Sequence, residues 1–179
     1  MKENTVPFDY DPSSIDALFI THGHIDHIGR IPKLVQDGFE GVIYSTPETK
    51  EIAVHMFDDA YKIMQYNLKK YGTKPLYEKE FIAKALSLWK TQDYHQSFNY
   101  GPFRVYFKDA GHILGSVMIQ FTPISGGKTL TFTGDLGNSP TPLLKDTEDI
   151  LGTSYLVMES VYGDRNHEPK DFRDERFRQ

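Results

Sequence analysis

Three histidines and one aspartate stand within six positions directly after an apolar run, and no other feature restricts the fold as strongly. The run at 15–20 is expected to form a buried strand. The polar residues that follow it are His22, His24, Asp26 and His27. Packing does not explain this cluster, because histidines and acids at a strand end are normally solvated singly. Imidazole and carboxylate groups bind metals, so the cluster predicts a metal site at the end of a strand.

The spacing within the cluster suggests two neighbouring ions. His22 and His24 are two positions apart, so on extended backbone their side chains point the same way and can grip one ion. Gly23 between them leaves the backbone unobstructed. Asp26 and His27 are expected at the turn into a helix, where they face a second ion. The chain contains no cysteine, which excludes thiolate ligands and disulfides.

Two later residues are expected to join the cluster. His112 and Asp135 each follow an apolar run and are flanked by glycines, which permit close approach of the backbone. Loops at the carboxyl ends of strands assemble sites on α/β scaffolds. The remaining histidines do not match ligand positions: His55 is expected on an exposed helix face, His95 in a loop and His167 in the charged tail.

The order of the apolar patterns predicts a layered α/β fold. Helical patterns separate the early strands, and short β-rich runs dominate after residue 96. The expected helices cover 31–36, 47–71 and about 78–90. Further strands are expected at 41–45, 103–108, 116–121, 129–133 and 155–158.

Composition describes an ordinary folded chain of 179 residues, with 39% hydrophobic and 25% charged residues. No run approaches the roughly 20 apolar residues of a membrane helix, and the first residues lack a secretory signal, so we expect a cytoplasmic protein without membrane contact. The formal charge of −5 argues against a general attraction to nucleic acid but leaves room for a local basic groove.

Three motifs give the sequence a specific resemblance to the metallo-β-lactamase superfamily, and within it to the β-CASP group of RNA-processing nucleases. They are Thr-His-Gly-His-Ile-Asp-His at 21–27, Ala-Gly-His-Ile-Leu-Gly-Ser at 110–116 and Glu-Ser-Val-Tyr-Gly at 159–163. In the last, Val161 stands where the group usually has threonine. His27 ends the first motif and His112 lies in the second, with 84 residues between them. This long connection also favours β-CASP over the glyoxalase, lactonase and β-lactamase branches.

The resemblance implies a partial αββα sandwich. The group opens with strands that this sequence lacks, and it later returns to the first fold with further histidines that are also absent. Residues 1–163 would form a partial metallo-β-lactamase domain, and 164–179 would begin a truncated β-CASP domain or a linker. The chain is therefore expected to be a fragment of a longer protein.

The resemblance also implies two zinc ions that share a bridging carboxylate, with manganese as the alternative ion. The ligands of the first ion would be His22, His24 and His112. Asp26 and His27 would hold the second ion, and Asp135 would bridge the two. Two residues would have catalytic roles: Asp26 would orient the attacking water and accept its proton, and Glu159 would orient a histidine from the later part of the protein.

The expected reaction is hydrolysis of a phosphodiester bond in single-stranded RNA by zinc-bound hydroxide. The fragment alone is expected to have an incomplete metal centre and little nuclease activity. Two alternatives remain open: a small-molecule ester or thioester hydrolase of the same fold, and a non-catalytic scaffold subunit of an RNA-processing complex. RNA is the expected partner, and a homodimer is a further candidate assembly.

Overall fold

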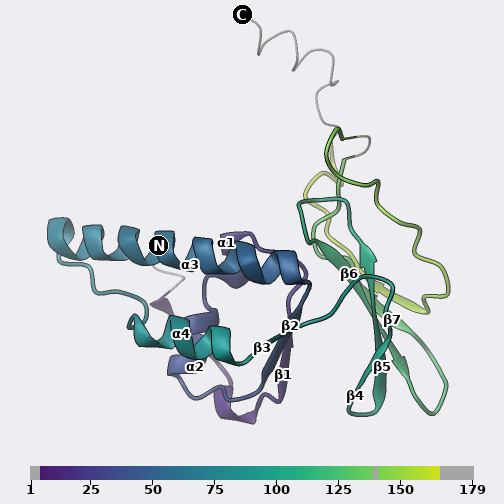
Figure 1. Ribbon diagram of the computed structural model, residues 1–179, viewed down its shortest axis with the longest axis horizontal. Coiled ribbons are helices and arrows are strands. Elements are labelled where there is room, and N and C mark those ends of the chain that lie inside the picture. The colour runs from purple at the N-terminus through teal and green to yellow at the C-terminus, as the bar shows by residue number, and fades with distance from the viewer. Residues whose placement is uncertain (1–4, 139–140, 166–179) are drawn as a thin grey trace, which may run out of the picture.

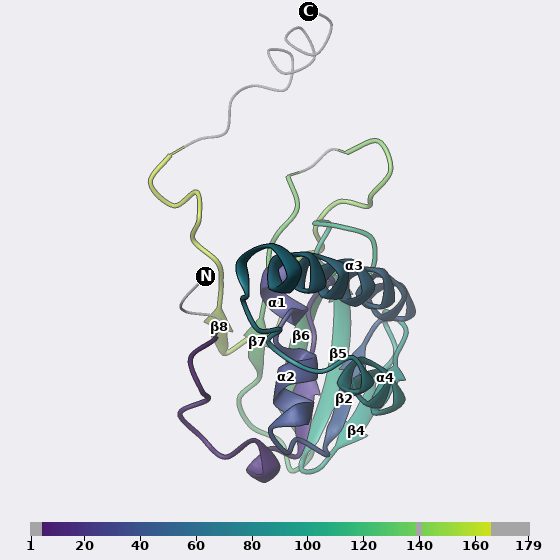
Figure 2. The ribbon, with the colours of Figure 1, turned by 90° about the vertical axis from the view of Figure 1, so that its left-hand side faces the viewer.

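A computed structural model describes residues 5–138 and 141–165, which form a layer of helices and two sheets (Figures 1 and 2). The helices are the 3-10 turn η2 (Pro12–Ser14), α1 (Ile25–Ile28), α2 (Ile31–Gln36), α3 (Pro47–Tyr71) and α4 (Glu80–Ser87). The strands are β1 (Ala17–Phe19), β2 (Val42–Ser45), β3 (Trp89–Thr91), β4 (Phe98–Tyr100), β5 (Phe103–Asp109), β6 (Val117–Pro123), β7 (Leu130–Phe132) and β8 (Tyr155–Val157). The predicted boundary after residue 163 stays a prediction, because 166–179 lie outside the described residues.

The first sheet is parallel, with the order β1-β2-β3, and it separates two hydrophobic cores. Side chains alternate along its strands, as the two-residue period of a strand requires. Leu18 and Ile43 belong to the core that contains the helices. Phe19 and Tyr44 belong to the core between the two sheets. Strands β1 and β2 therefore each contribute to both interfaces.

The second sheet has the order β4-β5-β6-β7-β8 and is antiparallel except for the parallel pair β7-β8. Phe107 and Ile119 fill its inner face. Phe121 meets Phe19 of the first sheet edge to face, with 4.9 Å between ring centroids. Within the described ranges, the four α-helices lie on the side of the first sheet, as Figure 1 shows. The arrangement of helix, sheet and sheet confirms the predicted partial sandwich.

The long helix α3 occupies the residues that its sequence signals predict. Its N-cap Thr46 accepts a hydrogen bond from the backbone N–H of Thr49, and Pro47 takes the first helical position. Gly72 ends the helix in the left-handed conformation, with φ of 69°. Among the described residues, no helix is long and apolar enough to cross a membrane.

The helix predicted at about 78–90 is wrong at its C-terminal end, where the chain forms β3. The backbone N–H of Ile43 donates to the carbonyl of Leu88 at 3.0 Å. The indole Nε1 of Trp89 donates to Ser45 Oγ at 2.7 Å. These contacts with a neighbouring strand outweigh the local helical pattern. The sequence pattern also misses α1, of four residues, and β4, of three residues.

Candidate metal centre

The turn after β1 brings His22 and His24 toward the same point. His22 is fully buried, and His24 is the N-cap residue of α1. Gly23 lies against helix α3: a β-carbon added there would stand 2.6 Å from Ile52 Cγ2. The sequence therefore needs a glycine here to pack the ligand turn against the helix, in addition to leaving the backbone open.

The turn that carries His112 is fixed to the beginning of α3. The backbone N–H of His112 donates to Ser116 Oγ at 3.0 Å. The carbonyl of Gly115 accepts hydrogen bonds from two buried hydroxyls, Thr46 Oγ1 at 2.7 Å and Thr49 Oγ1 at 2.9 Å. Gly115 has φ of +84°, a conformation that favours glycine. The helix start thus determines where the His112 turn lies.

The turn that carries Asp135 follows β7 and is held by the acid after β8. The backbone N–H of Leu136 donates to Glu159 Oε1 at 2.6 Å. Glu159 in turn donates its backbone N–H to Thr133 Oγ1 at 3.4 Å. Glu159 therefore holds the backbone next to Asp135, while its predicted action on a later histidine stays a prediction.

Four of the predicted ligands form one compact set. They are His22, His24, His112 and Asp135, and each offers an atom within 4.8 Å of the others. His24 Nδ1 lies 3.1 Å from the Nε2 atoms of both His22 and His112. Asp135 Oδ2 lies 3.7 Å from His22 Nε2 and 3.6 Å from His112 Nε2. Bonds of about 2.1 Å at tetrahedral angles place ligand atoms about 3.4 Å apart, so the set fits one zinc ion.

The other two predicted ligands lie beside this set, on its exposed side. His27 Nε2 is 3.5 Å from Asp135 Oδ1, the second oxygen of that carboxylate. Asp26 Oδ2 is 3.7 Å from His27 Nε2, and the Asp26 side chain is 77% exposed. The two oxygens of Asp135 thus approach different donors: Oδ2 approaches His22 and His112, and Oδ1 approaches His27.

Burial favours the neutral form of two histidines in the compact set. Burial, assisted by the charge of His27, lowers the pKa of His22 to about 4. Burial also lowers the pKa of His112, although Asp135 acts in the opposite direction. A metal binds the neutral imidazole, so this environment suits ligand histidines.

A threonine hydroxyl orients the buried histidine, and its removal is expected to weaken metal binding. Thr21 Oγ1 lies 3.1 Å from His22 Nδ1. A hydrogen bond there leaves Nε2 free for a metal. We expect Thr21→Val to lower zinc affinity about 10- to 100-fold, measured by competition with a chelating dye. Thr21→Ser keeps the hydroxyl and is expected to restore most of the affinity, whereas equal losses in both variants would contradict this role.

Sequence reasoning missed the hydroxyls that position the ligands. Thr21 precedes His22, and Ser116 follows His112 by four residues. This proximity to a ligand in the sequence could have identified both hydroxyls. The other histidines lie apart from the set: His55 is exposed on α3, and His95 Nε2 contacts Glu148 Oε1 at 2.6 Å. The predicted position of His167 lies outside the described residues.

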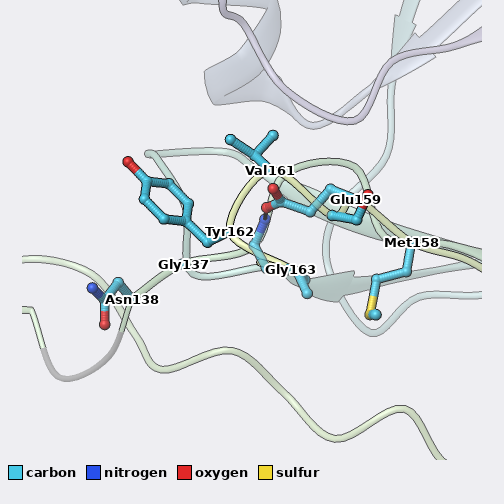
Figure 3. Close-up of a pocket in the computed structure, with 9 residues that line it drawn as sticks. Gly137, Asn138, Met158, Glu159, Val161, Tyr162 and Gly163 are labelled. Atoms are coloured by element: carbon cyan, nitrogen blue, oxygen red, sulfur yellow. Dashed lines mark hydrogen bonds between the residues drawn. The ribbon is translucent and has the colours of Figure 1, made fainter. Parts of the chain in front are cut away.

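A cavity of about 390 Å³ adjoins the Asp135 turn, between the segment after β7 and the segment after β8 (Figure 3). Leu136 and Asn138 line it from the first segment. Glu159 and Tyr162 line it from the second, and the Tyr162 ring is partly exposed. The same carboxylate that holds the Asp135 turn therefore forms part of the wall of this cavity.

Comparison with known proteins gives consistent matches. Residues 6–161 match the model of the metallo-β-lactamase superfamily. The chain is 33% identical over 166 residues to a ribonuclease of Thermus thermophilus. It is 36% identical over 155 residues to the transcription termination factor FttA of Pyrococcus horikoshii. It is 30% identical over 182 residues to the endoribonuclease YSH1 of Eremothecium gossypii.

These matches cover most of the chain but a smaller part of each relative. They include 93%, 85% and 98% of the chain, respectively. They include 36% of the Thermus ribonuclease and 23% of each of the other two proteins. The chain therefore spans about a third or less of the length of these relatives.

Proposed function

The chain belongs to the metallo-β-lactamase superfamily, and from this premise we propose that it carries the metal centre of a hydrolase that cleaves single-stranded RNA. The observation that carries the proposal is the position of Asp135, whose two oxygens face different histidines at 3.5 to 3.7 Å. Relatives named ribonuclease and endoribonuclease support RNA as the substrate. The cytoplasmic location and the homodimer stay predictions.

In this proposal the six residues hold two zinc ions. The compact set would bind the first ion through His22, His24 and His112. His27 and Asp26 would bind the second, and Asp135 would bridge the two. The donor spacings of 3.1 to 3.7 Å support this division. A site of imidazole and carboxylate groups also accepts manganese.

One side of the proposed centre is buried and the other is exposed, which indicates where a substrate would enter. Two bound zinc ions supply an activated water and positive charge for a phosphodiester. His22 is fully buried at the bottom of the site, whereas the Asp26 side chain is 77% exposed. A substrate would therefore approach from the side of Asp26, whose carboxylate would orient a water and accept its proton. The cavity beside Asp135 would receive part of the RNA strand.

The test compares two substrates, a single-stranded RNA and a small thioester. The chain is first stripped of metal and then reloaded with zinc. We expect slow cleavage of a labelled single-stranded RNA at stoichiometric protein concentration, and no hydrolysis of a small thioester. Cleavage should require the reloaded metal, because in this proposal the metal supplies the activated water. The measurement is the rate of product formation on a denaturing gel, with the thioester followed by absorbance.

An Asp135→Asn variant is the matched control, since it keeps the size of the side chain and removes the bridging charge. We expect it to lower the cleavage rate at least about 100-fold. Thioester hydrolysis without RNA cleavage would favour the small-molecule hydrolase. RNA cleavage that survives both EDTA and Asp135→Asn would contradict the proposed centre.

A further inference from the structure

The second half of α3 and the segment after it have a composition unlike the rest of this acidic chain. Residues 60–77 contain no aspartate or glutamate, in a chain with a formal charge of −5. They contain four lysines and four tyrosines, which are Lys62, Lys69, Lys70, Lys74, Tyr61, Tyr66, Tyr71 and Tyr77. Basic residues interleaved with aromatic ones are typical of surfaces that bind single-stranded nucleic acid.

The fold exposes this part of the chain. Figure 1 shows α3 running away from both sheets, with its C-terminal end at the far side of the helical layer. Tyr66 is 55% exposed and Tyr71 is 64% exposed. Each ring offers a flat apolar face on which another ring can stack.

A lysine connects the two exposed rings. Lys70 Nζ lies 5.2 Å from the centroid of the Tyr66 ring and 5.0 Å from that of the Tyr71 ring. It also donates a hydrogen bond to Tyr66 Oη at 2.9 Å. The rings are thus held beside a positive charge. We name Tyr66, Lys69, Lys70, Tyr71 and Lys74 the tyrosine-lysine surface.

The two acids that precede this surface on α3 share one lysine. Lys62 Nζ lies 2.6 Å from Asp58 Oδ2 and 3.3 Å from Asp59 Oδ1. With two carboxylates and one ammonium, this group keeps a net charge of −1, and it lies one turn before Tyr66. The surface itself has three lysines and no acid, so it presents positive charge to an approaching anion.

We propose that the tyrosine-lysine surface is a second contact for single-stranded RNA, apart from the metal centre; this inference rests on the proposed function. Lysines would neutralise phosphates, and the tyrosine rings would stack on unpaired bases, which a duplex keeps inside its helix. Helix α3 contacts the ligand turns at its beginning, through Thr49 and Ile52. From Ile52 to Tyr66 the helix rises about 20 Å, a distance that several nucleotides of an extended strand can span.

The test is RNA binding by the whole chain in EDTA, where no metal contributes. Fluorescence anisotropy with a short labelled oligouridylate gives the Kd. We expect Tyr66→Ala with Tyr71→Ala to weaken binding about tenfold or more, because each substitution removes the ring on which a base would stack. We expect Lys69→Gln with Lys70→Gln to lower the slope of log Kd against log salt by about 1.4, the value for two single-strand phosphate contacts.

Tyr155→Ala is the matched control. Tyr155 is 52% exposed and has Lys128 Nζ 5.0 Å from its ring centroid, so it repeats the same pair of groups on the second sheet. We expect its Kd to equal that of the parent chain. An unchanged Kd in the Tyr66 and Tyr71 variant, or an equal loss in Tyr155→Ala, would overturn the proposal.

Two further measurements, binding of duplex RNA and sedimentation, distinguish the possible occupants of the surface. Equal affinity for duplex RNA would overturn a contact based on stacking. A change in sedimentation of the Tyr66 and Tyr71 variant without a change in Kd would assign the surface to a second copy of the chain, and would also overturn the proposal. Because the experiment contains no metal, a failure of the proposed hydrolase activity leaves its result intact.

Discussion

A His24→Ala chain is expected to lose its bound zinc. His24 Nδ1 lies 3.1 Å from His22 Nε2 and 3.1 Å from His112 Nε2, so it stands between the other two histidines of the compact set. Its loss removes one of the three imidazoles and one of the four donors that converge on this point. We expect affinity to fall more than about 100-fold, beyond the effect of losing a residue that only orients a ligand. Plasma mass spectrometry of the purified chain measures the bound metal.

The control for this substitution is His55→Ala, which removes an exposed histidine from α3. We expect it to keep the one or two equivalents of zinc found in the parent chain. Circular dichroism should give the same helical signal for both variants. Zinc that persists at the parental level in folded His24→Ala would mean that the compact set does not bind the ion.

The site could be predicted from sequence to the extent that its information is local. His22, His24, Asp26 and His27 lie within six positions, and the glycines around His112 and Asp135 point to turns. Local motifs were enough to mark His22, His24, His112 and Asp135, and the fold brings these four residues together. Helix α3 was predictable for the same reason, since its caps at Thr46 and Gly72 are adjacent to it.

The remainder depends on contacts between distant segments. Trp89 begins a strand because it pairs with Ile43, and a helical pattern carries no trace of that partner. The bond from Leu136 to Glu159 joins residues 23 positions apart, so no local pattern places this acid beside the Asp135 turn. Asp135 Oδ2 approaches His22 and Oδ1 approaches His27 only once the fold brings the Asp135 turn to the turn after β1.

A single methyl group is expected to disturb the ligand turns of His112 and Asp135 together. Gly137 follows Asp135 closely, and its backbone N–H donates to the carbonyl of Ala110 at 2.9 Å. A β-carbon added at Gly137 would stand 1.9 Å from the carbonyl oxygen of Gly111 and 2.3 Å from its carbonyl carbon. These are backbone atoms that cannot rotate away, so one turn must move relative to the other.

We therefore expect Gly137→Ala to lower the free energy of unfolding by about 3 kcal/mol, the upper part of the range for overpacking, and to weaken zinc binding. Urea unfolding of the metal-free chain measures the first effect, and chelator competition measures the second. Gly101→Ala is the control: its φ is +52°, but a β-carbon there meets nothing within 4 Å. It should cost about 1 kcal/mol from backbone strain and leave zinc binding unchanged. If Gly137→Ala matched this control in both measurements, the two turns would be independent, and the metal centre would not depend on their contact.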